Sequence, residues 1–147
     1  MNTFFDEASR VRLVERLQKI DVQTGALWGR MSAAQMLAHC TATMQMPVGD
    51  LQVKRSFLSL IGWMFKGMIH SDKPFSKSSP TAPEFVIHDE RNFETEKKRF
   101  TDAFQKLTQG PATITCHDHP FFGKMTSHDW GRLVYKHLDH HLRQFGA

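Results

Sequence analysis

A twenty-residue stretch near the end of the chain, Thr126 to Phe145, constrains its fold more than any other stretch. Their apolar side chains recur at the three- and four-residue spacing of an amphipathic helix, at Trp130, Val134, Leu138 and Phe145. Thr126 offers an N-cap hydroxyl, and Asp129 places a carboxylate at the positive end of the helix. Gly146 follows the last periodic residue and marks the end of the helix. Gly131, inside the stretch, lowers helix stability by about 1 kcal/mol relative to alanine. We predict a helix over 126–145.

Two histidines lie on the apolar stripe of this predicted helix. His137 and His141 are four residues apart, so one imidazole lies a helical turn above the other. Paired imidazoles on one helix face are a common way to present two ligands to a metal ion. The H-x-x-x-H pattern is loose, however, and it also occurs where histidines are solvated or hydrogen-bonded. The pair is therefore a candidate metal site that needs further ligands.

Three more helices are predicted upstream, over Phe4 to Ile20, Ser32 to Met46 and Glu90 to Leu107. Ser32 and Gln35 have the spacing of a capping box, and Pro47 ends the second helix. No strand pattern, internal repeat or low-complexity tract competes with this interpretation. The four helices predict an all-α fold, a four-helix bundle forming one domain over residues 1–147.

Composition agrees with one soluble domain and excludes several classes of protein. The chain has 147 residues, 40% hydrophobic and 23% charged, which suits a folded globule. Its net charge of +4 is spread along the chain, so no nucleic-acid partner is predicted. Two cysteines without a C-x-x-C motif, and no signal peptide, predict a cytoplasmic protein. The most apolar run, Phe57 to Ile69, is too short to span a bilayer and contains Lys66.

The connection between the second and third predicted helices contains a further amphipathic segment, from Phe57 to Met68. Three functional interpretations are a lid over a pocket, a homodimer interface and a membrane-surface helix. We favour a short helix that covers the core. Ser71 to Pro83, rich in proline and serine, is predicted to be an irregular crossover.

The second predicted helix carries a third histidine, His39, on its apolar face. A single histidine in such a position is most often a hydrogen-bonded core residue. His39 lies about 10 Å from the start of its helix, and His137 and His141 lie about 7–13 Å from the end of theirs. Antiparallel packing would bring the three imidazoles to one level. Three neutral histidines with an open position suit zinc, nickel or iron(II).

The segments that carry these histidines resemble the DUF1569 family. The resemblance rests on W-G-R-M-S-A-A-Q-M-L-A-H-C, P-T-A-P-E-F, H-P-F-F-G-K-M and K-H-L-D-H-H-L-R-Q-F-G, which span nearly the whole chain in order. That family belongs to the DinB-like superfamily, with YfiT-type metal hydrolases and bacillithiol or mycothiol transferases. The resemblance implies an up-down-down-up four-helix bundle that holds a divalent metal. By motif, the ligands carry over to His39, His137 and His141.

Neighbouring residues are weaker candidates. His140 is rotated about 100° from His141 on a helix and should miss the metal, as should Asp139. Cys40 is predicted to be a small core residue. Gln35, one turn before His39, could hydrogen-bond a metal-bound water or substrate, or serve the helix structurally.

A rival cluster, Cys116, His117 and His119, lies in a connection that lacks a fixed scaffold. We expect His119 to lie near the pocket mouth instead, with Phe121 and Phe122 packing inward. Trp28, Trp63 and Trp130 are candidate pocket walls, although aromatic residues at these spacings usually belong to the core.

These observations predict a metal-dependent enzyme that acts on a small-molecule substrate, either a hydrolase or a transferase of a low-molecular-weight thiol. No glutamate follows a ligand as in H-E-x-x-H, so the sequence identifies no general base. Two alternatives stay open. One is a non-catalytic protein that binds a metal or a small ligand, for sensing or stress response. The other is an interaction module that dimerises through Phe57–Met68.

Overall fold

The computed structural model describes residues 2–55, 59–77 and 83–147 and is mostly helical. The long helices are α1 (Glu7–Leu17), α2 (Ala33–Gln45), α5 (Phe93–Thr108) and α6 (Ser127–Gln144). The short ones are α3 (Ser59–Gly62), η1 (Trp63–Phe65), α4 (Gly67–His70), η2 (Pro83–Phe85) and η3 (Pro111–Thr113). The predicted all-α class is confirmed. Contrary to the prediction of no strand, β1 (Asp118–His119) and β2 (Gly123–Lys124) form a short antiparallel ladder.

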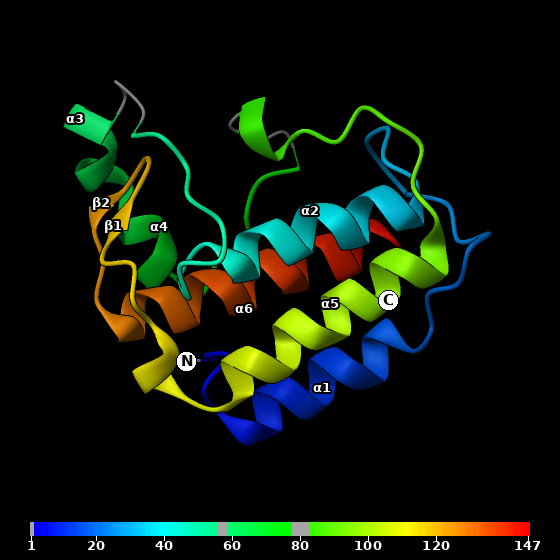
Figure 1. The fold of residues 1–147 in the computed structure, drawn as a ribbon, viewed down its shortest axis with the longest axis horizontal. Coiled ribbons are helices and arrows are strands. Elements are labelled where there is room, and N and C mark those ends of the chain that lie inside the picture. Colours follow the sequence, from blue (N-terminus) through cyan, green and yellow to red (C-terminus); the bar gives the residue numbers. More distant parts are fainter. Residues whose placement is uncertain (1, 56–58, 78–82) are drawn as a thin grey trace.

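The long helices pack around one apolar core. Helix α2 contacts both α5 and α6, and α1 contacts α6. Following the colours along the ribbon in Figure 1, α1 and α6 run in one direction and α2 and α5 in the other. The core side chains come from these helices and from the N-terminal arm, residues 2–6. Several of them are almost completely buried, including Phe4, Leu13, Leu37, Leu107 and Trp130. None of the described helices is both long and apolar enough to cross a bilayer.

Side-chain caps set the helix ends and explain small differences from the predicted boundaries. Ser32 and Gln35 form the predicted capping box of α2, and Thr126 and Asp129 form one at the start of α6. Helices α1 and α5 begin three residues later than predicted. The Asp6 carboxylate accepts from the backbone N–H of Ser9, and the Asn92 side chain accepts from that of Thr95, so each begins a helix.

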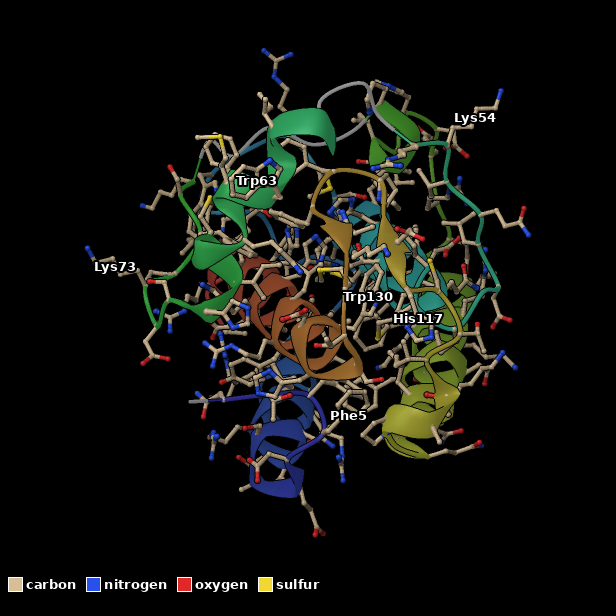
Figure 2. The ribbon with its side chains drawn as sticks, turned by 90° about the vertical axis from the view of Figure 1, so that its left-hand side faces the viewer. Phe5, Lys54, Trp63, Lys73, His117 and Trp130 are labelled. Atoms are coloured by element: carbon tan, nitrogen blue, oxygen red, sulfur yellow. The ribbon has the colours of Figure 1, made fainter. Side chains whose placement is uncertain are left out.

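The N-terminal arm lies directly against α6. The backbone N–H of Phe4 donates to the carbonyl of Gly131 at 2.9 Å. A Cβ at Gly131 would lie 2.6 Å from both Phe5 Cδ2 and Thr3 Oγ1, which is too close for unbonded atoms. In Figure 2, Phe5 lies near the chain's N-terminal end, below Trp130 of α6. The glycine that weakens α6 locally therefore lets the arm pack against it.

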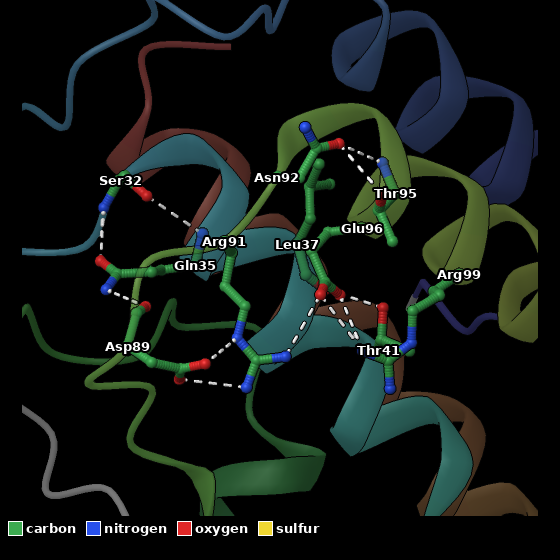
Figure 3. A network of polar contacts seen from close by, with 10 residues as sticks. All are labelled: Ser32, Gln35, Leu37, Thr41, Asp89, Arg91, Asn92, Thr95, Glu96 and Arg99. Carbon is green, nitrogen blue, oxygen red and sulfur yellow. Dashed lines mark hydrogen bonds and ion pairs between the residues drawn. The ribbon is translucent and has the colours of Figure 1, made fainter.

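A polar network joins the start of α2 to the start of α5 (Figure 3). The Gln35 amide donates to the carbonyl of Asp89, whose carboxylate pairs with Arg91 at 2.9 Å. Arg91 and Arg99 also pair with Glu96, which is only 3% exposed. Two guanidinium partners satisfy this buried carboxylate, which would otherwise destabilise the fold. The network anchors the chain that leads from η2 into α5.

The prediction of a core-covering helix at Phe57–Met68 is wrong for most of its apolar residues. Residues 57 and 58 lie outside the described residues. Trp63 and Met64 are 64% and 65% exposed, whereas Ile69 of the following helix is completely buried. The segment is broken into α3, η1 and α4 and contacts α6 through α4. Only one turn of it therefore reaches the core, and Trp63 is neither core nor pocket wall.

The contact between the arm and α6 predicts an unusual result for Gly131→Ala. Alanine favours a helix by about 1 kcal/mol, but its methyl group would displace Phe5 and Thr3. We expect a net loss of about 1–2 kcal/mol in the free energy of unfolding, measured by urea denaturation. Gly67→Ala is the matched control, because a Cβ at that helical glycine would meet no described atom within 4 Å. Equal or greater stability of Gly131→Ala would contradict this account.

Candidate metal centre

Three histidines from two helices meet between α2 and α6. The ring centroid of His39 lies 4.8 Å from that of His137 and 4.7 Å from that of His141, and the latter two are 4.5 Å apart. One nitrogen from each ring lies within 4.8 Å of the others. For comparison, two nitrogens bound to one tetrahedral zinc ion are about 3.3 Å apart. Small side-chain rotations would therefore place all three nitrogens on a common ion.

Burial keeps these imidazoles uncharged. His39 and His141 are 4% and 7% exposed, and His137 is partly buried. Desolvation lowers the pKa of His39, lowers that of His141 to about 3, and holds that of His137 well below its ordinary value. Repulsion from neighbouring imidazoles adds to the shift for His137 and His141. At neutral pH each ring is neutral and keeps one nitrogen lone pair.

Hydrogen bonds of Gln144 determine the tautomer of His141. Gln144 Nε2 donates to the carbonyl of Trp28 at 2.7 Å, so its oxygen faces His141. That oxygen lies 2.8 Å from His141 Nδ1 and can only accept. Nδ1 therefore carries the proton, and the lone pair is on Nε2. Such a hydrogen bond to the remote ring nitrogen is typical of metal-binding histidines.

Gly29 makes this arrangement possible. Its φ angle is +83°, and a Cβ there would lie 2.5 Å from Gln144 Nε2. Any other residue at this position would have a strained backbone, and its Cβ would collide with the Gln144 amide. The backbone N–H of Leu27 also donates to the carbonyl of Gln144 at 2.7 Å. The loop before α2 is thus held against the last turn of α6.

The carbonyl of Phe85 determines the tautomer of His39. It lies 2.8 Å from His39 Nδ1, which must donate because a carbonyl oxygen only accepts. The lone pair of His39 is therefore also on Nε2, and Nε2 lies 2.9 Å from Nε2 of His137. Two lone pairs repel at that distance. Either a proton on His137 or a cation must lie between the two nitrogens.

The donor set fits a divalent first-row ion. His39 and His141 each direct an Nε2 lone pair to the same volume, with the opposite nitrogen hydrogen-bonded. His137 Nδ1 is buried and has no hydrogen-bond partner among the described residues, so its ring lacks this support. Three neutral imidazoles are the ligands that zinc, nickel and iron(II) accept.

Aromatic side chains lie around His140, the sequence neighbour of His141. The His140 ring lies 5.9 Å from that of Trp28, 6.2 Å from that of Phe75 and 5.0 Å from that of His141. His140 thus diverges from the three histidines, as helical geometry predicts, yet it still contacts one of them. Asp139 pairs with Arg16 and Arg143 at 2.6 Å and 2.8 Å, away from the histidines. Cys40 is buried in the core as predicted, and burial raises the pKa of its thiol.

The two predicted pocket residues have structural roles. Gln35 uses its side chain in the capping box and in the bond to Asp89, so it does not face the histidines. His119 Nδ1 accepts from the backbone N–H groups of Phe121 and Phe122, at 3.0 Å and 3.2 Å, within the β1–β2 turn. Its ring packs on that of Trp130 at 5.3 Å. The rings of Phe121 and Phe122 are only partly buried.

The rival cluster does not assemble. His117 is exposed, and His119 is committed to its turn. Cys116 Sγ lies 3.3 Å from the carbonyl of Asp118. Among the described residues, a different second group of possible ligands does occur: His70, His128 and Asp129.

Three supporting residues were missed by the sequence prediction: Gln144, Gly29 and Phe85. Gln144 follows His141 by three residues, a spacing that places them on one helix face, so it could have been found. Phe85 contributes a backbone carbonyl from a distant turn, and no side-chain pattern signals that. Gly29 could have been suspected from its place in W-G-R before the cap of α2.

Neutral buried histidines make stability depend on pH. Burial lowers the pKa of His119 to about 4. Below its ordinary value of about 6.5 the unfolded chain therefore binds more protons than the folded one, and the free energy of unfolding falls as pH falls from about 6.5 toward 4. We expect His119→Asn, whose amide oxygen can still accept from the turn, to reduce that loss between pH 7 and 5 by about 2 kcal/mol. Urea denaturation in the presence of a chelator measures it. An unchanged pH slope would show that His119 is not a buried neutral group.

Comparison with known proteins identifies a family and no closer relative. Searches of curated proteins and of solved structures each returned no significant match. A family model described as "Protein of unknown function (DUF1569)" matches residues 3–147, nearly the whole chain. The chain therefore belongs to the DUF1569 family.

Proposed function

We propose that this protein binds one divalent first-row metal ion, zinc, nickel or iron(II), through His39, His137 and His141. The observation that carries the proposal is the convergence of three neutral imidazoles, two of which must direct an Nε2 lone pair inward. Buried histidines that only stabilised a core would each need a hydrogen-bond partner for both nitrogens. Among the described residues, His39 Nε2 has His137 Nε2 as its partner at 2.9 Å, and the buried His137 Nδ1 has none.

We further propose that the fold is an up-down-down-up four-helix bundle of the DinB-like type. The opposite directions of α1 and α6 relative to α2 and α5 support this topology. So does the place of the histidines, one on α2 and two on α6 four residues apart, which is the ligand pattern of that superfamily. The short helices α3, η1 and α4 then form an elaboration of the connection between the second and third bundle helices.

The reaction class that we propose is hydrolysis, or transfer of a low-molecular-weight thiol to an electrophilic small molecule, in the cytoplasm. A divalent ion held there would act as a Lewis acid, favouring deprotonation of a water molecule or a thiol. The three histidines would bind as neutral donors, while Gln144 and the Phe85 carbonyl keep two of the rings in place. Trp28 and Phe75 would exclude bulk water and pack against an apolar part of the substrate.

A specific observation favours a second candidate, a non-catalytic metal- or ligand-binding protein. The carboxylate nearest in sequence to the histidines, Asp139, is held by Arg16 and Arg143 and is not available as a general base. A panel of thiols and electrophiles, incubated with the protein with and without added metal, separates the two. Metal-dependent turnover would support the enzyme, and metal binding without turnover would support the second candidate.

The metal site predicts the behaviour of His141→Ala. We expect untagged His141→Ala protein to contain one equivalent less of tightly bound metal than the unmodified protein, because two imidazoles hold such an ion weakly. Elemental analysis after dialysis measures this. His88→Ala is the matched control, because His88 is exposed and lies outside the cluster. Equal metal content in the unmodified protein and His141→Ala would rule out the ligand assignment.

Support from outside the three ligands is tested at Gln144. Gln144→Leu removes the acceptor for His141 Nδ1, and we expect the affinity for zinc to fall about 10- to 100-fold. Gln144→Glu keeps an acceptor and should retain more of the affinity. Competition with a chromophoric chelator gives the dissociation constants, and circular dichroism checks the fold. If Gln144→Leu binds zinc as tightly as the unmodified protein, the hydrogen bond has no role in the site.

A further inference from the structure

We propose a second divalent-cation site, formed by His70 of α4 with His128 and Asp129 from the first turn of α6. It shares no residue with the core histidines and does not depend on the function proposed for them. Helix α4 packs beside the N-terminal part of α6, which brings the exposed His70 and His128 next to the largely buried Asp129 side chain. Their candidate ligand atoms all lie within 4.8 Å of one another.

The distances suit a shared ion. His70 Nε2 lies 3.0 Å from Asp129 Oδ1. Two ligand atoms bound to one ion at about 2.1 Å are themselves about 3.0 Å apart in an octahedral site and about 3.4 Å apart in a tetrahedral one. The rings of His70 and His128 are nearly parallel, at an interplanar angle of 11° and a centroid distance of 6.2 Å. Both histidines are exposed and can turn to close the remaining gap.

The backbone beneath these side chains is held firmly. Asp129 is in the capping box of α6, where its Oδ2 accepts from the backbone N–H of Thr126 at 2.9 Å. Arg132, only 2% exposed, donates to the carbonyl of Ile69 at 3.0 Å and to that of His70 at 2.8 Å. One buried guanidinium therefore ties α4 to α6 directly under His70. A site whose backbone is ordered in advance loses little entropy when it binds an ion.

Neighbouring charges leave one carboxylate oxygen for the cation. Lys66 Nζ lies 3.4 Å from Asp129 Oδ2, on the oxygen that also caps the helix. Oδ1 is the oxygen that faces His70. The positive end of α6 opposes a bound cation, and the charge of Asp129 offsets this effect. An ion bound at Oδ1 would lie where His70 Nε2 now approaches Asp129 at 3.0 Å.

The ligand set selects the class of ion. Two imidazoles and one carboxylate oxygen suit zinc, nickel or copper(II), whereas calcium and magnesium prefer sites made of oxygen alone. Exposure leaves coordination positions open to water. The site would bridge α4 and α6. The exposed Trp63 and Met64 lie in η1, just before α4, so metal binding would fasten the segment 59–70 to the rest of the molecule.

Zinc titration of full-length, untagged protein after chelator treatment tests the inference. We expect two equivalents of zinc bound by the unmodified protein, one by His128→Ala and one by His141→Ala. The control His88→Ala should bind two, since His88 is exposed and belongs to neither group. His128 lies on the surface, so its replacement should leave the fold intact, and circular dichroism verifies this.

The outcomes separate this site from the core site. Equal zinc stoichiometry for the unmodified protein and His128→Ala overturns the second site, whatever His141→Ala does. If the core site fails instead, the unmodified protein and His141→Ala each bind one equivalent and His128→Ala binds none. Limited chymotrypsin digestion gives a second readout. Zinc should slow cleavage after the exposed Trp63, which lies just before α4, in the unmodified protein and not in His128→Ala, and equal protection of both would count against a bridge.

Discussion

Burial of three imidazoles at one level between α2 and α6 is the constraint on which the rest of the structure depends. A histidine removed from water must stay neutral and must find partners for its ring nitrogens, because an unsatisfied buried polar group costs about 1–3 kcal/mol. His39 and His141 obtain an outward partner each, the Phe85 carbonyl and the Gln144 amide. Their inward nitrogens are left facing one another and His137. This leaves a volume that is electron-rich and water-poor, as a cation site requires.

Segments outside the long helices orient the histidine rings that the helices carry. Helices α2 and α6 carry the rings, but the turn at Phe85 and the loop at Trp28 decide which nitrogen of each ring is protonated. Both connections are themselves anchored. Hydrogen bonds to Gln144 hold the loop before α2, and the ion pairs of Arg91 and Glu96 hold the chain after η2. The contacts that anchor these two connections therefore also determine which ring nitrogen of His39 and His141 keeps its lone pair.

Helix α6 holds three other parts of the chain in place: the N-terminal arm, helix α4 and the loop before α2. Near its start Gly131 receives the N-terminal arm, Arg132 holds α4 through two backbone carbonyls, and Gln144 at its end holds the loop before α2. The segment around Trp63 is attached through α4 and leaves its apolar side chains in solvent. A second cation site at this junction would strengthen an attachment that already includes Arg132, Lys136 and the buried Ile69.

The sequence by itself determined the features that depend on neighbours a few residues away. Capping boxes at Ser32 and Thr126, the four long helices and their apolar faces follow from local hydrogen bonding and helical periodicity, and their boundaries were predicted within a few residues. The depths of His39, His137 and His141 along their helices also follow from the sequence, but their meeting depended on antiparallel packing, which the sequence analysis assumed.

Only the tertiary structure decided which distant backbone groups meet. The Phe85 carbonyl on His39, the Trp28 carbonyl on Gln144 and the arm against Gly131 have no side-chain signature. The amphipathic pattern of the segment around Trp63 likewise did not reveal that its apolar face lies in solvent. The reason is physical: periodicity reports which residues share a face, whereas the contacts of that face depend on chain segments many residues away.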